Sequence, residues 1–525
     1  MSTKREWFHE AVFYEVRVRS FRDGNGDGIG DFRGLTEALG HLEALGVNAL
    51  WLMPTFPSPL VDDGYDVADY CDVHPDLGTL ADFDAFLAAA HARGIRVILD
   101  LVLNHTSDEH AWFRESRSSR TNAKREWYVW SDDDTRYAGV HVIFSGAETS
   151  NWAWDAHTGQ YWWHRFFARQ PDLNYDHAAV REAMWGVLAF WLDRGVDGFR
   201  VDAVPYLFER EGTSCESLPE THALIREYRR RIDQRYPGRM LLAEACQTPA
   251  ELVPYFGNGQ DGAGFHMAFH FPLVPQLFLA MCREDRGPVV RTVTGMPYIP
   301  EGAQWATFLR NHDELSVALA SDAEADELFA AYAGDPRARL YRGIRRRIAP
   351  LMGHDDRRVL LLHAVLLALP GTPFLYYGDE LGLTDDLSRP DRDGVRLPMP
   401  WTSADERTPG TSVERQWGDE RSLLERMRRL VHARRDAPGA GTGAIAFLQP
   451  AETCVLAFTR ELEHGALVFA ANLSGRDVRT SLECPALADL VLRDALDGSE
   501  VRAGESGTIA LALEPYGFRW RVARR

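Results

Sequence analysis

The chain has 525 residues, of which 58 are Lys or Arg and 77 are Asp or Glu, so its formal net charge is −19. That length suggests about two to five domains, or one large barrel with additions. Hydrophobic residues make up 45% of the chain and charged residues 26%, which excludes bulk disorder. Because nucleic-acid binders concentrate Lys and Arg on one face, the acidic balance argues against a nucleic-acid partner.

The six cysteines are scattered, with no CxxC pair and no His cluster at zinc spacing. Free thiols in a reducing compartment are the default for such a pattern. The segment Met1–Glu10 is charged and lacks the apolar core of a signal peptide. The longest apolar run, near Val359–Pro370, is too short to span a bilayer. We therefore expect a cytoplasmic protein without a membrane partner, and the sequence leaves homo-oligomerisation open.

Short apolar runs alternate with helical patterns through the first part of the chain, and eight of these runs are candidates for buried strands. The candidates are Val12–Val16, Ala49–Met53, Arg96–Asp100, Gly198–Asp202, Met240–Glu244, Phe265–Phe269, Ala306–Leu309 and Pro373–Tyr377. Helical spacers such as Asp82–Arg93 and Ala179–Arg194 separate them. Eight β-then-α units predict an α/β fold, namely a (β/α)8 TIM barrel with insertions.

Two intervals break this rhythm. Between Asn104 and Asp176 the chain is rich in Trp, Asp, Ser and Gly without a clear helix period, which predicts an inserted loop domain after the third barrel strand. After about Pro438, short strands separated by turns predict a C-terminal antiparallel β-sandwich. The segment Asp436–Gly443 has the composition of a linker. The predicted domains are a barrel over 1–104 and 177–437, an insert over 105–176 and a C-terminal domain over 438–525.

Polar side chains gather where the predicted barrel strands end. Asp202, Glu244 and Asp313 end or follow three of the strands, and the C-terminal ends of barrel strands converge on one mouth. Three carboxylates brought together cannot all stay ionised, because like charges repel at close range. Enzymes that cleave glycosidic bonds use one neutral carboxyl group beside one ionised carboxylate. A single strand-end Asp is more often a cap or an ion-pair partner, but three together favour catalysis.

Four stretches carry a family resemblance: Asp100–His105, Gly198–Ala203, Leu242–Glu244 and Phe308–Asp313. They resemble the four signature regions of the α-amylase family, glycoside hydrolase family 13. Gln170–Asn174 is similar to a further signature of that family in its loop domain. The resemblance spans nearly the whole chain. Other stretches, among them Val204–Gly212, Leu218–His222, His266–Pro272 and Gly343–Arg347, are similar to the branch of the family that isomerises maltose to trehalose.

The resemblance implies a nucleophile at Asp202, an acid/base at Glu244 and a transition-state stabiliser at Asp313. It also implies a tight glucose pocket formed by Asp62, Tyr65, His105, Phe166, Gln170, Arg200, His312 and Arg396. Asp62 and Arg396 would form an ion pair that closes the far end of that pocket. The implied activity is retaining glucosyl transfer that isomerises the disaccharide maltose to trehalose. The alternatives are an exo-acting α-glucosidase, a transglucosylase with another acceptor, and a non-catalytic sugar-binding protein.

Two residues depart from the pattern of that branch. Cys246 stands where Asn is usual, and Pro400 stands where Gln is usual. Both lie where an acceptor sugar would be held, so the identity of the acceptor is the least constrained part of the expected activity.

Two structural cation sites are expected. The segment Asp23–Asp31 alternates oxygen-bearing side chains with glycines, which is a calcium-loop pattern. Its ligands would be Asp23, Asn25, Asp27, the Ile29 carbonyl and Asp31, and a surface loop rich in Asx turns is the alternative. The family resemblance implies a second site formed by Asn104, Asp172, Glu209 and the carbonyl groups of Tyr206 and Leu207. Both sites would hold Ca²⁺, although one could hold Mg²⁺.

Two further patterns bear on the site. The stretch Gly257–Gly262 matches GxGxxG, but no strand precedes it, so no organic cofactor is expected. An aromatic cluster within the insert lines the sugar cleft or forms the small core of the insert itself, and the sequence leaves both readings open. Its members are Trp152, Trp154, Tyr161, Trp162, Trp163, Phe166 and Phe167.

Overall fold

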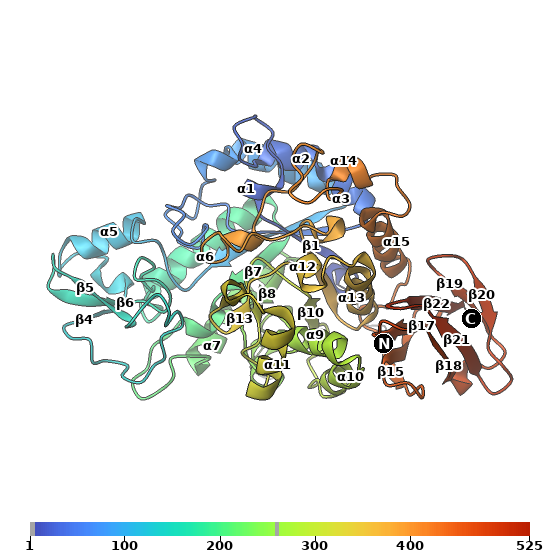
Figure 1. Ribbon diagram of the computed structural model, residues 1–525. Helices are drawn as coiled ribbons and strands as arrows, with labels where there is room; N and C mark the ends of the chain where they lie inside the picture. The colour runs from blue at the N-terminus through green and yellow to red at the C-terminus, as the bar shows by residue number, and fades with distance from the viewer. Residues whose placement is uncertain (1–5, 258–261, 525) are drawn as a thin grey trace.

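Eight parallel strands form a closed barrel at the centre of the chain, in the order β1-β14-β10-β9-β8-β7-β3-β2 (Figure 1). The barrel strands are β1 (Phe13–Val16), β2 (Ala49–Leu52), β3 (Arg96–Val102), β7 (Gly198–Asp202), β8 (Met240–Ala243), β9 (Met267–Phe269), β10 (Gln304–Phe308) and β14 (Thr372–Tyr376). The prediction of a (β/α)8 barrel is confirmed, and each strand candidate overlaps one barrel strand.

The structure is a computed structural model that describes residues 6–257 and 262–524. Residues 1–5 belong to the charged N-terminal segment and residues 258–261 to the GxGxxG match, so those two predictions fall partly outside the described residues. Among the described residues, no helix is both long and apolar enough to cross a membrane.

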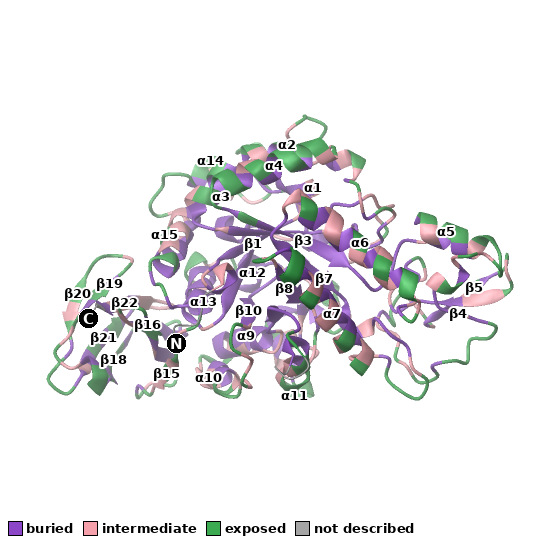
Figure 2. Cartoon of the chain, turned by 180° about the vertical axis from the view of Figure 1, so that it is seen from behind, coloured by how far each residue is buried: buried purple, intermediate pink, exposed green. Residues whose placement is uncertain are grey.

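Most of the helices surround the barrel, and many of their residues are buried (Figure 2). The α-helices are α1 (Val18–Phe21), α2 (Phe32–Glu37), α3 (Leu39–Leu45), α4 (Leu80–Ala92), α5 (Ala111–Ser118), α6 (Ala178–Arg194), α7 (Pro219–Arg235), α8 (Pro249–Leu252), α9 (Leu273–Arg283), α10 (Gly287–Thr294), α11 (Asp322–Tyr332), α12 (Ile348–Leu351), α13 (Asp356–Ala368), α14 (Val413–Gln416) and α15 (Leu423–Arg435). Short 3-10 helices cover Trp7–His9, Pro75–Leu77, Arg125–Trp127, Val204–Tyr206, Val253–Phe256, Pro336–Ala338, Asp379–Leu381, Asp393–Val395 and Pro485–Leu487.

Local sequence explains how β7 is placed beside β8. Helix α6 ends at Arg194 and is capped by Gly195, whose φ of 105° is a left-handed conformation that glycine adopts without strain. Strand β7 begins at Gly198, where an added Cβ would lie 2.1 Å from the Met240 carbonyl oxygen. The missing side chain therefore lets β7 approach β8 closely, and these two strands lead directly to Asp202 and Glu244.

The insert after β3 is a small domain with its own sheet and helix. Its strands are β4 (Trp130–Ser131), β5 (Trp152–Asp155) and β6 (Gln160–Trp163), paired in the order β4-β6-β5. Helix α5 was not predicted, because its eight residues are too few to show a clear period. The His110 side chain caps it by accepting a hydrogen bond from the Trp112 amide.

The C-terminal domain consists of two antiparallel sheets, in agreement with the predicted sandwich. One sheet has the order β15-β16-β17-β22-β19-β20 and the other pairs β18 with β21. The strands are β15 (Ile445–Leu448), β16 (Val455–Leu462), β17 (Gly465–Asn472), β18 (Val478–Glu483), β19 (Val491–Asp494), β20 (Glu500–Arg502), β21 (Thr508–Leu513) and β22 (Phe518–Arg524). Val468 and Ala470 of β17 pack with Leu482 of β18 and Leu511 of β21 in a core between the sheets.

The other face of the larger sheet packs on the barrel. Phe458 and Trp520 of this face belong to the same apolar cluster as the barrel core. Two buried arginines stand at the junction, Arg434 of α15 and Arg460 of β16, and both donate to the carbonyl oxygen of Ala440. Arg434 also donates to the Leu367 carbonyl, and Arg460 to the Ala368 carbonyl, at the end of α13.

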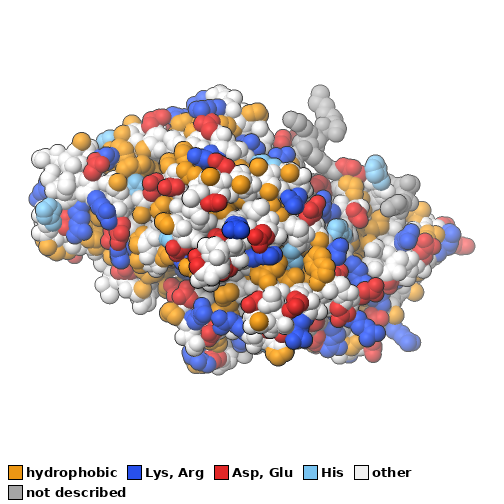
Figure 3. All heavy atoms as spheres, turned by 90° about the horizontal axis from the view of Figure 1, so that it is seen from above, with side chains coloured by type: hydrophobic (Ala, Val, Ile, Leu, Met, Phe, Trp, Pro, Cys, Tyr) orange, Lys and Arg blue, Asp and Glu red, His pale blue; other side chains and the backbone are white. Residues whose placement is uncertain are grey.

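A three-stranded sheet stands on the loops after β10, where it adjoins the pocket described below. It contains β11 (Leu315–Ser316), β12 (Arg339–Leu340) and β13 (Gly343–Ile344), in the order β11-β13-β12. On the face of the molecule in Figure 3, acidic and basic side chains are intermixed rather than gathered by sign.

Candidate active site

The predicted catalytic carboxylates lie together in one pocket at the carboxyl ends of the barrel strands. The pocket has a volume of about 200 Å³, and Asp202, Glu244 and Asp313 all line it. Seven of the eight predicted sugar-binding residues also line it: Asp62, Tyr65, His105, Phe166, Arg200, His312 and Arg396. Gln170 is buried behind the wall, where its Nε2 donates to Asp62 Oδ2 at 2.9 Å. The structure therefore brings the predicted residues together, and their catalytic and sugar-binding roles stay predictions.

Arg200 organises the first two carboxylates. Its Nη1 donates to Asp202 Oδ1 at 2.5 Å and to Asp100 Oδ1 at 2.8 Å, while its Nη2 lies 3.8 Å from Glu244 Oε2. Burial raises the pKa of Asp202 well above its usual value; the Arg200 guanidinium opposes this shift and the Glu244 carboxylate adds to it. The Glu244 carboxylate therefore disfavours ionisation of Asp202, whereas the Arg200 guanidinium favours it.

The backbone that follows Asp202 is strained. Ala203 has a φ of 48°, a left-handed conformation that costs a non-glycine residue on the order of 1 kcal/mol. In this conformation the Ala203 amide donates to Glu244 Oε2 at 3.0 Å. The strained turn thus ties the end of β7 to the carboxyl group that follows β8.

Asp313 is held by three cationic groups. Its Oδ1 lies 3.1 Å from both Arg392 Nε and Arg396 Nη2, and its Oδ2 lies 3.3 Å from His312 Nε2. Burial alone would raise the pKa of Asp313, but Arg392, His312 and Arg396 outweigh burial and hold the pKa well below its usual range. Asp313 is therefore a fixed negative charge at the end of the pocket.

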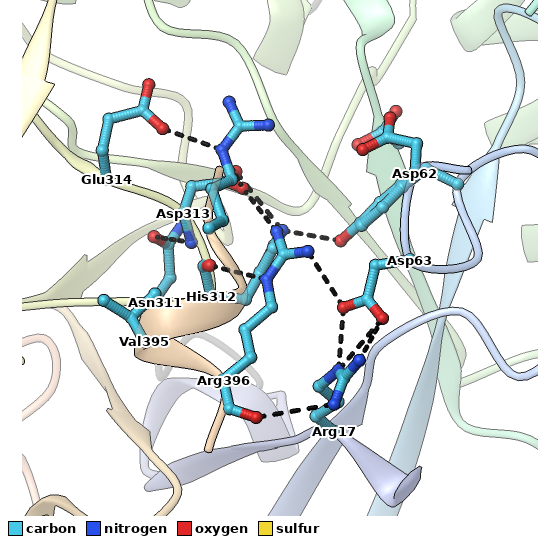
Figure 4. A network of polar contacts seen from close by, with 12 residues as sticks. Arg17, Asp62, Asp63, Asn311, His312, Asp313, Glu314, Val395 and Arg396 are labelled. Atoms are coloured by element: carbon cyan, nitrogen blue, oxygen red, sulfur yellow. Dashed lines mark hydrogen bonds and ion pairs between the residues drawn. The ribbon is translucent and has the colours of Figure 1, made fainter. Parts of the chain in front are cut away.

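The closing ion pair differs from the prediction. Arg396 pairs with Asp63 rather than Asp62, at 2.9 Å between Nη1 and Oδ2, and Arg17 forms a second ion pair with Asp63 (Figure 4). Asp63 has a φ of 51°, and this backbone turn directs its side chain toward the two arginines. Asp62 instead accepts from Gln170, and burial raises the pKa of Asp62 to about 6.

An aromatic cover, formed by Phe144, Phe166 and Tyr341, stands at the wall of the pocket. The rings of Phe144 and Tyr341 stack with centroids 4.8 Å apart, and Phe144 also lies 5.6 Å from Phe166. The guanidinium of Arg392 lies 5.3 Å from the Phe144 ring and 5.2 Å from the Tyr341 ring. Phe144 and Arg392 line the pocket, so this contact joins its lining to the insert and the loop between β12 and β13.

Some residues of the aromatic cluster of the insert line the pocket, and others form the small core of the insert. Phe166 lines the pocket, whereas Trp152 and Trp163 form a small core with Tyr137 and Val129. Trp154 is 52% exposed and belongs to neither. Cys246 lines the pocket beside Ser316, with the Cys246 Sγ 3.8 Å from the Ser316 hydroxyl.

Sequence reasoning missed several residues of this site. They are Glu15, Asp63, Phe144, Tyr341 and Arg392. Glu15 had a usable signal, since it is a charged residue inside an apolar strand candidate and therefore needs a buried partner. Phe144 and Tyr341 had none, because they lie in loops whose conformation depends on distant contacts.

The first predicted cation site, Asp23–Asp31, is a loop rich in Asx turns. Asp23 Oδ1 accepts from the amides of Asn25 and Gly26, and Asp27 Oδ1 accepts from the Ile29 amide. Asp31 Oδ1 caps α2 by accepting from the Gly34 amide. These bonds leave further lone pairs on each carboxylate, so the loop fits both a cation site and the Asx-turn alternative.

The second predicted cation site contains orphaned oxygen atoms. Among the described residues, Asn104 Oδ1, Asp172 Oδ2 and Glu209 Oε1 are buried without a hydrogen-bond partner. Burial raises the pKa of Asp172 to about 8 and the pKa of Glu209 well above its usual value. Unpaired buried oxygens of this kind fit a hard cation such as Ca²⁺, which takes carboxylate, amide and carbonyl ligands. His105 and Asp172 form an isolated bridge, so the site joins β3 to the insert.

Comparison with known proteins identifies the family. Residues 16–330 match the family described as alpha amylase, catalytic domain, and residues 445–520 match the maltogenic amylase C-terminal domain. The chain therefore belongs to the α-amylase family.

Several individual members of this family are similar to the chain over most of its length. The chain is 46% identical to a trehalose synthase of Pimelobacter sp. (strain R48), over 98% of this chain and 95% of that protein. It is 50% identical to the trehalose synthase/amylase TreS of Mycolicibacterium smegmatis, over 88% of this chain and 82% of that protein. Among solved structures, the α-glucosyl transfer enzyme XgtA superposes with a TM-score of 0.78 at 30% identity, over 99% of this chain and 100% of that one.

Proposed function

We propose that the protein isomerises maltose to trehalose by retaining, intramolecular glucosyl transfer. The observation that carries this proposal is the small pocket in which Asp202, Glu244 and Asp313 meet under the cover of Phe144 and Tyr341. High identity to proteins named trehalose synthase over nearly the whole chain supports the choice of substrate and product.

In the first half of the reaction, Asp202 attacks the anomeric carbon of the terminal glucosyl unit. Arg200 lies nearer to Asp202 than to Glu244, which favours negative charge on Asp202, as a nucleophile requires, and Glu244 acts as the acid. Glu244 gives that proton to the departing glycosidic oxygen, so glucose leaves and a glucosyl-Asp202 ester forms. Asp313 and His312 hold ring hydroxyls of the glucosyl unit as positive charge develops on it.

In the second half, the released glucose turns within the covered pocket and presents its anomeric hydroxyl. Glu244 takes the proton of that hydroxyl, whose oxygen attacks the anomeric carbon and displaces Asp202. Two inversions retain the α configuration, and no atom is gained or lost between maltose and trehalose. The cover matters because a trapped glucose has a far higher effective concentration than glucose in bulk, so transfer competes with attack by water.

The test is a proton NMR time course of maltose incubated with ¹³C-labelled glucose. We expect unlabelled trehalose as the main product, because the acceptor is the glucose released from the same maltose. Free glucose as the main product would make the protein an α-glucosidase. Heavy incorporation of label would instead indicate an open transglucosylase.

We also propose two structural Ca²⁺ sites. The first is the loop of Asp23, Asn25, Asp27, Ile29 and Asp31. The orphaned oxygens of Asn104, Asp172 and Glu209 support the second, with the Tyr206 and Leu207 carbonyls completing it. Each ion would neutralise carboxylates and fix a loop, and neither takes part in bond breaking.

A further inference from the structure

Glu15 is a buried carboxylate in β1 that lies behind the pocket wall. Its side chain is 2% exposed, and it is not among the residues that line the pocket. Its Oε1 accepts two hydrogen bonds from a single residue, at 2.5 Å from His312 Nδ1 and at 3.3 Å from the His312 amide. Glu15 thus holds both the ring and the backbone of the residue that precedes Asp313.

The hydrogen bonds around His312 fix which of its ring nitrogens carry protons. The Tyr65 hydroxyl donates its only proton to Asp100 Oδ2 at 3.0 Å, and the other oxygen of Asp100 lies 2.8 Å from Arg200 Nη1. At the same time the Tyr65 oxygen lies 2.8 Å from His312 Nε2. Since that oxygen must accept, Nε2 carries a proton.

The second ring nitrogen faces Glu15, and the surrounding charges favour a proton there too. The groups that face the ring are Glu15 from β1, Asp313 after β10 and Tyr65 after β2, while Arg396 Nε donates to the His312 carbonyl at 3.0 Å. Burial lowers the pKa of His312, but Asp313 and Glu15 outweigh burial and raise the pKa to about 9. Burial also raises the pKa of Glu15, and His312 opposes that shift.

We propose that Glu15 is a positioning residue that holds His312 as an imidazolium, with its Nε2–H directed at the Tyr65 hydroxyl oxygen and at Asp313 Oδ2. This inference rests on the proposed glucosyl transfer and deepens it. Glu15 itself touches no substrate. It acts by fixing the orientation and the charge of His312, which in turn holds the Tyr65 hydroxyl and the Asp313 carboxylate in place through both halves of the reaction.

The test compares Glu15→Gln with the wild type, because Gln keeps the size and an acceptor oxygen but removes the charge. Glu43→Gln, which removes an exposed carboxylate of α3, is the matched control. The primary readout is the ¹⁵N resonance of the His312 ring across pH 5 to 10, assigned by its loss in His312→Gln. The second readout is kcat and KM for maltose.

We expect both ring nitrogens of wild-type His312 to be protonated at pH 7 and the ring to lose a proton at least about one pH unit lower in Glu15→Gln. We expect kcat to fall about 10- to 100-fold, the range for losing a hydrogen bond to a charged group, with a smaller change in KM. Glu43→Gln should match the wild type in both readouts.

A neutral His312 ring in the wild type at pH 7 overturns the inference, whether or not Glu15→Gln folds. A ring that titrates equally in Glu15→Gln and in the wild type also overturns it, even if kcat falls. Failure of the wild type to form trehalose would refute the proposed function instead, while the His312 resonance would still decide the role of Glu15.

Discussion

Asp63 is the residue whose replacement tests the electrostatics of the pocket most directly. It is the shared partner of Arg17 and Arg396, and the side chains of Asp63 and Arg396 are only 8% and 4% exposed. Removing one member of a buried ion pair costs about 3–5 kcal/mol, and here Arg17 would lose its carboxylate partner while Arg396 would keep Asp313. Asp63→Asn isolates this effect, since Asn tolerates the φ of 51° as Asp does.

We expect Asp63→Asn to lower Tm by at least about 5 °C in thermal unfolding. It should also lower kcat/KM for maltose, because Arg396 would lose one of the two carboxylates that aim it at Asp313. The control is Asp335→Asn, which breaks the exposed ion pair with Arg337 and should cost no more than about 1 kcal/mol. Adding Arg17→Met to Asp63→Asn should recover part of the loss, since one unpaired buried cation is removed.

The same change predicts a pH dependence with a definite sign. Burial would raise the pKa of Asp63, but Arg17 and Arg396 outweigh burial and lower the pKa. A carboxyl whose pKa is lower in the folded state adds stability above the pKa of the unfolded state, about 3.9, and loses it as the pH falls through the folded value. The Tm difference between wild type and Asp63→Asn should be constant from about pH 5 to 8 and shrink below about pH 4. Equal Tm values for both proteins at pH 7 would refute the reasoning.

The remaining predictions concern the catalytic nucleophile, the bound cations and the aromatic cover of the pocket. Asp202→Asn should lose almost all maltose turnover while Tm is kept, and a variant retaining more than about a tenth of the wild-type rate would exclude Asp202 as the nucleophile, since that is a loss of only about 1.4 kcal/mol. Chelation with EDTA should lower Tm, because an ion bound only by the folded state stabilises it. Asp172→Ala should reduce this drop, and a Tm that EDTA leaves unchanged would argue against any occupied cation site. Phe144→Ala should increase the share of free glucose among the products of maltose, because water gains access to the glucosyl intermediate. The exposed Trp154→Ala serves as its control, and an unchanged glucose share in Phe144→Ala would contradict a role for the cover.

The sequence predicts the barrel well because fully buried parallel strands appear as continuous apolar runs such as Ala49–Leu52. It also predicts which carboxylates meet, since Asp202 and Glu244 stand at strand ends that the fold brings together. The sequence does not predict which of two adjacent residues points into the site. Whether Asp62 or Asp63 faces Arg396 depends on a left-handed backbone turn, and no residue type announces that turn at an Asp. Helix α5 was missed for a related reason, because eight residues give too short a pattern.

The contact of the C-terminal sheet with the barrel has a consequence for engineering the chain. Gly439, Ala440 and Gly441 are buried, and the Gly441 carbonyl accepts from the Gly371 amide. The segment of linker composition therefore packs against the barrel rather than being exposed. Cutting the chain there would uncover Phe458 and Trp520 on one piece and leave the Ala368 carbonyl at the end of α13 without Arg460 on the other. The barrel and the larger C-terminal sheet are therefore expected to melt in one transition, and a barrel truncated at 437 to precipitate instead of working as a smaller catalyst.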